Sequence, residues 1–154
     1  MREMDFSERN LWNRWSGVKE FWAAMQGETK QLVKVRLEQC LQAEVTAHLG
    51  CGRYDHSHER RGYRNGSYGR NLLTRYGWID GLTMPRVRAG DFASRVVEKY
   101  RRRQRQMDQV VLEAFLLGHS TRKTGRLFRR VFGATISAQG VSNIVRTVNK
   151  LIHG

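Results

Sequence analysis

The stretch MDQVVLEAFLLGHSTRKTGRLFRRVFGATISAQGVSNIVRTVNKLI, residues 107–152, decides the fold of this chain because it divides itself into three short helices. Gly118 and Gly133 stand where a left-handed residue ends a helix. Ser120 and Ser137 follow them, where a side-chain oxygen begins the next helix. The pattern predicts three helices joined by two defined turns.

The third of these helices, from Ala138 to about Ile152, has two distinct faces at 3.6 residues per turn. Its apolar face consists of Val141, Ile144, Val145, Val148 and Ile152. Its polar face consists of Gln139, Asn143, Arg146 and Lys150, flanked by Ser142.

The middle helix repeats this design, with Leu127, Phe128 and Val131 expected to face inward. Its expected outer face carries Arg122, Arg126 and Arg129. No acidic residue follows Glu113, whereas a merely solvated face normally mixes both signs of charge. The basic residues beyond that point are Arg122, Lys123, Arg126, Arg129, Arg130, Arg146 and Lys150.

Two packed helices of this kind match the requirements of a helix-turn-helix-like module that binds DNA. Amide side chains can pair with adenine and guanidinium groups with guanine, while flanking basic residues hold phosphates. The candidates for base contact are Gln139, Ser142, Asn143 and Arg146. The connection from Phe132 to Ser137 is longer than the usual turn of that motif, and an ordinary three-helix bundle with solvated polar faces remains the alternative.

Bulk composition points to a polyanionic partner. The 154 residues contain 28 Lys and Arg against 14 Asp and Glu, a formal net charge of +14. Double-stranded DNA is the first candidate and an anionic membrane surface the second. No apolar run approaches the ~18 residues that span a bilayer, and the N-terminus shows no signal peptide. Cys40 and Cys51 are too few for a disulfide framework, so we expect the reducing environment of the cytoplasm. With DNA as the partner, we expect a nucleoid-associated protein with no small-molecule substrate.

Residues 1–50 predict a helical region for packing or oligomerisation. Large apolar residues recur at helical spacing over 1–26, Gly27 is expected to end that helix, and a second follows from Glu28 to Leu49. The first helix carries Leu11, Trp12, Trp15, Val18, Trp22 and Met25. The second carries an apolar stripe of Leu32, Val35, Cys40, Leu41, Val45 and Leu49, with Glu28, Glu38 and Glu44 among basic residues on a solvated face.

Residues 51–69 interleave Arg with Tyr and predict a basic loop that contacts a DNA backbone, or else a solvated connector. A zinc site is a weaker alternative, because the spacing of His48, Cys51, His56 and His58 matches no paired ligand motif. We therefore predict no metal site.

From residue 70 to 88 the apolar period becomes two, which predicts a β-hairpin that turns at Gly77. Pro85 fits the end of an edge strand. Phe92, Val96 and Val97 could add a short third strand. The run that follows is the densest in positive charge and predicts a phosphate-binding segment, or else a solvated helix start. Its candidates are Arg101, Arg102, Arg103 and Arg105.

Three segments in this order resemble the N-terminal part of the Mutator-like insertion-sequence transposases of bacteria. They are AEVTAHLG (43–50), RRGYRNGSYGRNLLTRYGWIDGLTMPRVRAGDF (60–92) and VVEKYRRRQRQMDQVVLEAFLLGHSTRKTGRLFRRVFGATISAQGVSNIV (96–145). The resemblance covers about residues 37–150.

The resemblance implies an N-terminal region that binds terminal inverted repeats and helps the protein multimerise, with itself or with full-length transposase. It also implies a downstream RNase H-like domain whose Asp-Asp-Glu triad holds two divalent metals for strand cleavage and transfer. The sequence ends at Gly154, roughly where that domain would begin, and Asp80, Asp91, Glu98 and Asp108 match no catalytic position. We therefore expect either a truncated transposase or a DNA-binding fragment of one, with no catalytic residue and no cofactor in this chain.

The sequence thus predicts an α+β protein, mostly helical, in three parts. These are a helical region (1–50), a basic loop with a small hairpin (51–100) and a helix-turn-helix-like DNA-binding module (101–154). The predicted function is recognition of transposon ends. A stand-alone regulator that inhibits transposition, and an enzyme completed by a second polypeptide, are the other interpretations.

Overall fold

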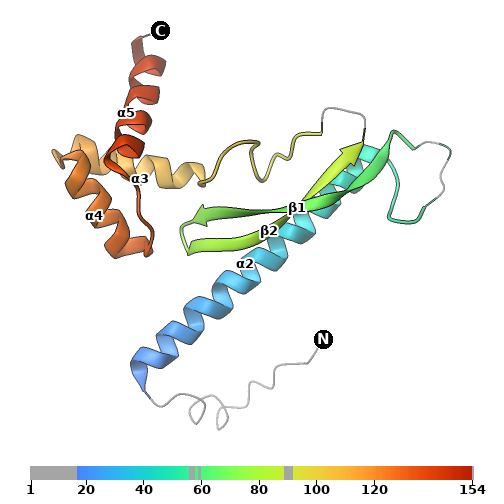
Figure 1. Ribbon diagram of the computed structural model, residues 1–154, viewed down its shortest axis with the longest axis horizontal. Helices are drawn as coiled ribbons and strands as arrows, with labels where there is room; N and C mark the ends of the chain where they lie inside the picture. The colour runs from blue at the N-terminus through green and yellow to red at the C-terminus, as the bar shows by residue number, and fades with distance from the viewer. Residues whose placement is uncertain (1–16, 56–57, 59, 89–91, 154) are drawn as a thin grey trace.

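The computed structural model describes residues 17–55, 58, 60–88 and 92–153, with side chains described up to Thr147. Helix α2 (Val18–Leu49) comes first, followed by strands β1 (Tyr63–Thr74) and β2 (Gly77–Arg88). Helices α3 (Arg105–Leu116), α4 (Thr121–Phe132) and α5 (Ala138–His153) complete the chain. The hairpin lies along α2, and its turn points toward the three C-terminal helices (Figure 1). Across these described ranges, no helix combines the length and apolar character needed to cross a membrane.

Helix α2 is a single helix of 32 residues, so the predicted break at Gly27 is wrong. A glycine inside a helix costs only about 1 kcal/mol, which the packing of a long helix can offset. The helix ends where predicted, with Gly50 in the left-handed conformation at φ 69°.

The buried face of α2 differs from the predicted stripe. Leu41, Val45 and Leu49 are buried as expected, but Leu32 and Cys40 are exposed. The helix packs on the hairpin through positions four apart, which lie one above another on a helix. These are Val33, Leu37, Leu41, Val45 and Leu49.

The predicted hairpin and its turn are confirmed. Thr74 pairs with Gly77 across a two-residue turn, and Gly77 adopts φ 100°. The Thr74 hydroxyl donates to the Gly77 carbonyl at 3.0 Å and accepts from the Tyr76 amide at 3.2 Å. Pro85 lies inside β2, opposite Ser67, beside an irregularity in the strand register.

The predicted loop ends earlier than expected, because β1 already begins at Tyr63. Residues 65–69 are exposed, so they show no apolar alternation, yet Ser67, Tyr68 and Gly69 pair with β2. Backbone pairing with an apolar partner strand holds this polar segment in the sheet.

The segment between β2 and α3 forms no third strand within residues 92–104. Val97 is buried against α2 and the hairpin instead. Further along, Leu73 of β1 receives a hydrogen bond from the Gln104 amide and donates one to the Arg102 carbonyl, both at 2.9 Å. This short parallel bridge fixes the linker, residues 98–104, against the edge of β1.

Acidic side chains of α2 help to hold this arrangement. The Glu38 carboxylate accepts from the Thr83 amide at 2.8 Å. The Glu44 carboxylate accepts from the Ser94 hydroxyl and from the amides of Arg95 and Val96. The prediction that these acids only line a solvated face is wrong, because their partners lie more than 40 residues away in sequence.

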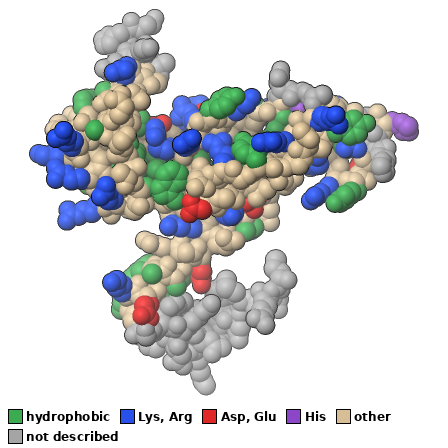
Figure 2. All heavy atoms as spheres, viewed as in Figure 1, with side chains coloured by type: hydrophobic (Ala, Val, Ile, Leu, Met, Phe, Trp, Pro, Cys, Tyr) green, Lys and Arg blue, Asp and Glu red, His purple; other side chains and the backbone are tan. Residues whose placement is uncertain are grey.

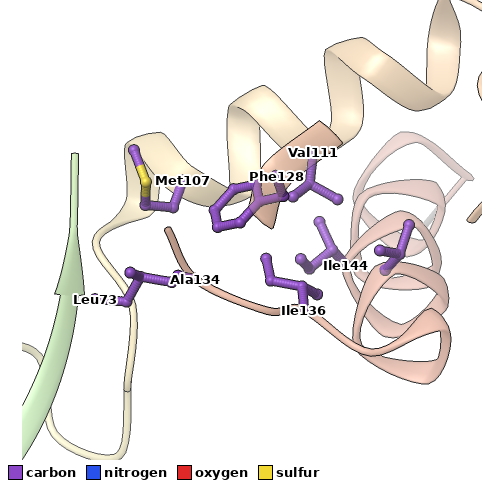
Figure 3. Packing of buried hydrophobic residues seen from close by; sticks show 8 residues of the cluster. Leu73, Met107, Val111, Phe128, Ala134, Ile136 and Ile144 are labelled. Atoms are coloured by element: carbon purple, nitrogen blue, oxygen red, sulfur yellow. The ribbon is translucent and has the colours of Figure 1, made fainter. Parts of the chain in front are cut away.

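A continuous core joins the three C-terminal helices to the hairpin. Met107 and Val111 of α3 pack with Phe128 of α4 and with Val141 and Ile144 of α5. Leu73 of the hairpin enters the same cluster (Figure 3). Trp78 packs against this cluster. The hairpin therefore sets the position of the three helices through shared apolar contacts.

Candidate nucleic-acid interface

Helix α4 forms a basic surface because its two ends are fixed and most of its outer positions are Arg or Lys. The Ser120 hydroxyl accepts from the Lys123 amide at 3.3 Å, and Gly133 ends the helix at φ 63°, as the sequence predicted. Five basic residues of the helix are exposed, and its first turn has no acid. They are Arg122, Lys123, Arg126, Arg129 and Arg130.

The inward face of α4 is turned relative to the prediction. Phe128 is buried, but Leu127 is 39% and Val131 62% exposed. Thr124 is buried instead, and a Cβ at Gly125 would lie 2.8 Å from the Ile136 carbonyl oxygen. The close approach of the backbone at Gly125 brings this side of the helix onto the turn before α5 and leaves Leu127 and Val131 outside.

Four of the basic α4 residues line one open hollow of about 540 Å³, together with His119 and Leu127. They are Lys123, Arg126, Arg129 and Arg130. Lys and Arg side chains gather at this end of the molecule, over α4 (Figure 2). Such a concentration of one sign of charge attracts a polyanion.

Helix α5 presents the predicted polar face next to a capped N-terminus. The Ser137 hydroxyl accepts from the Gly140 amide at 3.0 Å, as predicted for an N-cap residue. Gln139 and Asn143 are exposed one turn apart, and Gln139 Nε2 donates to Asn143 Oδ1 at 2.9 Å. This bond leaves Gln139 Oε1 and Asn143 Nδ2 directed to solvent, so the two amides together offer one acceptor and one donor.

The other base-contact candidates differ in their surroundings. Arg146 is exposed, two residues from the buried Ile144. Ser142 is half-buried, and its hydroxyl donates to the Ala138 carbonyl at 3.0 Å. Lys150 belongs to α5, but its side chain lies outside the described residues. Among the described α5 side chains, residues 138–147, none lines the basic hollow, so the structure does not bring these base candidates and the phosphate candidates of α4 into one depression.

Most arginines of the linker are already paired with acids. Arg101 Nε lies 2.6 Å from Glu98 Oε2, and Arg105 also pairs with Glu98. Arg103 Nε lies 2.9 Å from Asp108 Oδ1. A phosphate would have to replace these carboxylates, whereas the exposed guanidinium of Arg102 has no ion pair in the part of the chain that is described.

A second hollow, of about 940 Å³, lies between the hairpin and the linker and was not predicted from the sequence. Aromatic rings and guanidinium groups line it together with Asp80. Its signal in the sequence was an aromatic residue, Tyr100, within a run of basic residues. The side chains that give it its character are Tyr68, Arg70, Trp78, Tyr100 and Arg102.

The residues considered for zinc or for catalysis have other surroundings. The His48 ring packs against the Phe92 ring, and Cys51 is buried against Val45 and Leu49. His56 and Asp91 lie outside the described residues. Over the ranges that the structure covers, no three His, Cys, Asp or Glu side chains gather closely enough to hold a metal ion.

Comparison with known sequences defines the class of protein. The sequence pattern described as "Transposase, Mutator family" matches residues 13–153, which is most of the chain. The chain belongs to the Mutator family of transposases, and the predicted resemblance is confirmed.

Individual relatives are transposases of bacterial insertion sequences. The transposase for insertion sequence element ISRM5 of Rhizobium meliloti (strain 1021) is 30% identical over 135 residues, which is 88% of this chain and 34% of that protein. The transposase for IS905 of Lactococcus lactis subsp. lactis is 32% identical over 77% of this chain and 30% of that protein. The transposase for IS256 in transposon Tn4001 of Staphylococcus aureus is 27% identical over 81% of this chain and 32% of that protein. This chain therefore spans about a third of the length of these relatives.

Proposed function

We propose that this chain binds the terminal inverted repeats of an insertion sequence and supplies the DNA recognition step of transposition. The observation that supports it most is the pair of helices α4 and α5. Exposed basic residues cover α4 without any acid, and two hydrogen-bonded amides stand one turn apart near the start of α5.

The paired amides suit an adenine in the major groove. Adenine presents an acceptor, N7, next to a donor, the N6 amino group. Asn143 Nδ2 can donate to N7, and Gln139 Oε1 can accept from the amino group. Arg146, one turn further along α5, is the candidate for an adjacent guanine.

The basic hollow of α4 and the free Arg102 are the candidates for phosphate contact. Contacts to phosphates fix the register of a protein on the duplex without reading its sequence. Membership of the transposase family supports DNA as the polyanion. Strand cleavage and transfer, which the family resemblance implies for an Asp-Asp-Glu domain, are not part of what we propose for the described residues.

The test is to measure binding to two duplexes over a range of salt concentrations. One duplex carries the terminal repeat of the insertion sequence that encodes the protein, and the other carries the same bases in scrambled order. We expect the repeat to bind at least about 10³-fold more tightly. If six phosphates are neutralised, the logarithm of the affinity falls with that of the salt concentration at a slope of roughly −5. Equal affinities for both duplexes would contradict the proposed recognition.

A further inference from the structure

The hollow between the hairpin and the linker has a composition different from that of the basic surface on α4. Three aromatic side chains line it, namely Tyr68, Trp78 and Tyr100, together with Arg70 and Arg102. Basic and hydrophobic side chains lie next to one another along the upper side of the molecule, where the linker runs (Figure 2). A surface that only attracts phosphates needs no aromatic rings.

Tyr100 is the residue in this hollow that packing explains least. It adopts φ 67°, a left-handed conformation that costs a residue with a side chain about 1–2 kcal/mol. It stands in a tight turn in which the Arg101 amide donates to the Glu98 carbonyl at 3.3 Å, a position where glycine is usual. Its side chain is 87% exposed, so burial of the ring does not offset the cost. Strained residues of this kind concentrate at functional sites.

The other lining residues are held in place by the fold. Trp78 is half-buried because it packs against the shared apolar core. An Arg70 guanidinium nitrogen donates to the Glu98 carbonyl at 3.3 Å, and the Arg86 guanidinium lies 4.7 Å from the centre of the Tyr68 ring. The backbone of Arg102 is fixed to Leu73, while its side chain is exposed. The hollow is therefore a preformed surface, with Tyr100 and Arg102 at its open side.

We propose that this hollow binds an unstacked stretch of single-stranded DNA. Bases stack on aromatic side chains whatever their sequence, and guanidinium groups hold the backbone between them. In a duplex both faces of each base are covered by its neighbours, so Tyr100 and Trp78 can stack only on a base that has left the helix. Asp80 is the one carboxylate in the lining and repels phosphate, which directs the backbone toward Arg102 and Arg70.

This binding is separate from recognition of the duplex by α4 and α5, since no residue of either helix whose side chain is described lines the hollow. The two sites can consequently be tested independently. Failure of one assay leaves the other interpretable.

The experiment compares a fluorescent oligothymidine strand with an abasic analogue of the same length, using the full chain and fluorescence anisotropy. We expect the oligothymidine to bind about tenfold or more tightly than the analogue, because only the former carries bases that can stack. Tyr100→Gly should reduce this difference severalfold, because it removes the most exposed of the stacking rings. Since glycine adopts the left-handed conformation of this turn without steric strain, the variant should be at least as stable as the parent protein.

Two further variants assign the roles. Tyr54→Ala removes another exposed tyrosine with a left-handed backbone (φ 66°) that lies outside the hollow, and it should leave the preference for bases unchanged. Arg102→Gln should weaken binding of the oligothymidine and of the abasic analogue by the same factor, since it removes a phosphate contact. Equal binding of both strands by the parent protein would overturn the proposal. Equal loss of both strands in Tyr100→Gly, with the base preference kept, would overturn it as well.

Discussion

Gln139 Nε2 donates to Asn143 Oδ1 at 2.9 Å, so two adjacent side chains on the first turns of α5 form one hydrogen-bonded unit. We expect the two amides to recognise one base together, because each amide fixes the orientation of the other. The consequence is that the contributions of the two residues to recognition are not additive.

We predict that Asn143→Ala removes the preference for one base pair of the terminal repeat, at about 1–3 kcal/mol, and that Gln139→Ala does nearly the same. The double substitution should cost little more than either single one. Competition binding against a panel of repeats with single base-pair changes measures this. Gln109→Ala, at an exposed position of α3, is the control and should leave every relative affinity unchanged. Additive losses in the double variant would show that the amides act separately.

Arg126→Ala should weaken binding to all duplexes alike and reduce the steepness of the salt dependence by about 1, since it removes a phosphate contact without touching a base. Salt titrations on the repeat and the scrambled duplex give both quantities. The matched control is Arg36→Ala, an exposed arginine on α2 with the same loss of charge. An altered ratio between repeat and scrambled duplex would assign Arg126 to base contact instead.

Glu98 pairs with Arg101 of the linker and with Arg105 of α3, and Glu98→Gln should free Arg105 for phosphates and leave Arg101 only its longer pair with Asp108, at 3.4 Å. We expect tighter binding to any duplex and a salt dependence steeper by up to about 2. Glu113→Gln makes the same change of charge at an exposed position of α3, outside any of these ion pairs, and separates release of the arginines from a general increase in positive charge. If both variants change the slope equally, the linker does not contact DNA.

Gly125→Ala should destabilise the protein by about 1–2 kcal/mol, because the added Cβ would lie 2.8 Å from the Ile136 carbonyl oxygen and backbone cannot easily yield. Gly27→Ala is the matched control. Nothing lies within 4 Å of a Cβ there, so the better helix former should stabilise α2 by up to about 1 kcal/mol. Urea denaturation measures the free energy of unfolding of both variants, which should fall for Gly125→Ala and rise for Gly27→Ala. A stabilised Gly125→Ala variant would contradict the described approach of α4 to the turn before α5.

Glu44→Ala should cost about 2 kcal/mol of unfolding free energy, since its carboxylate accepts hydrogen bonds from Ser94, Arg95 and Val96. Glu28→Ala removes a half-buried acid of the same helix and should change the stability by much less. Denaturation midpoints give the comparison. Equal effects would mean that the contact with residues 94–96 contributes nothing beyond the charge.

The parts of the fold that the sequence predicted correctly are those with a local cause. Ser120 and Gly133 bound α4 through contacts within a few residues, and Gly77, at φ 100°, supplies the left-handed residue directly after the two turn residues of the hairpin. The three-helix order and the hairpin followed from such signals. Family membership was also recognisable, because it depends on the order of motifs along the chain.

The parts predicted wrongly depend on contacts between distant residues. The polar stretch from Tyr63 to Gly69 is a strand because β2 pairs with it, and Glu44 binds residues about 50 positions away. The sequence pattern places Leu127 and Val131 in the core. They are exposed because α4 is oriented by the close approach of Gly125 to Ile136. Of the candidate site, the capped helices and exposed polar faces were predictable. The ion pairs of the linker and the aromatic hollow were not, because they require the folded chain.

The uninterrupted course of α2 has a mechanical consequence. A helix of 32 residues measures about 48 Å, the length of roughly fourteen base pairs of B-form DNA. Its C-terminal part packs on the hairpin, and the stretch from Trp22 to Lys30 lines a hollow with the hairpin turn and the end of α4. The side chains of Val18 and Trp22, in its first described turns, are exposed. A molecule bound at the N-terminal turns of α2 is held at a fixed distance from the C-terminal turns that pack on the hairpin, and in a fixed orientation about the helix axis. One residue inserted into α2 would rotate its N-terminal turns by about 100° around the helix axis and shift them along it by about 1.5 Å.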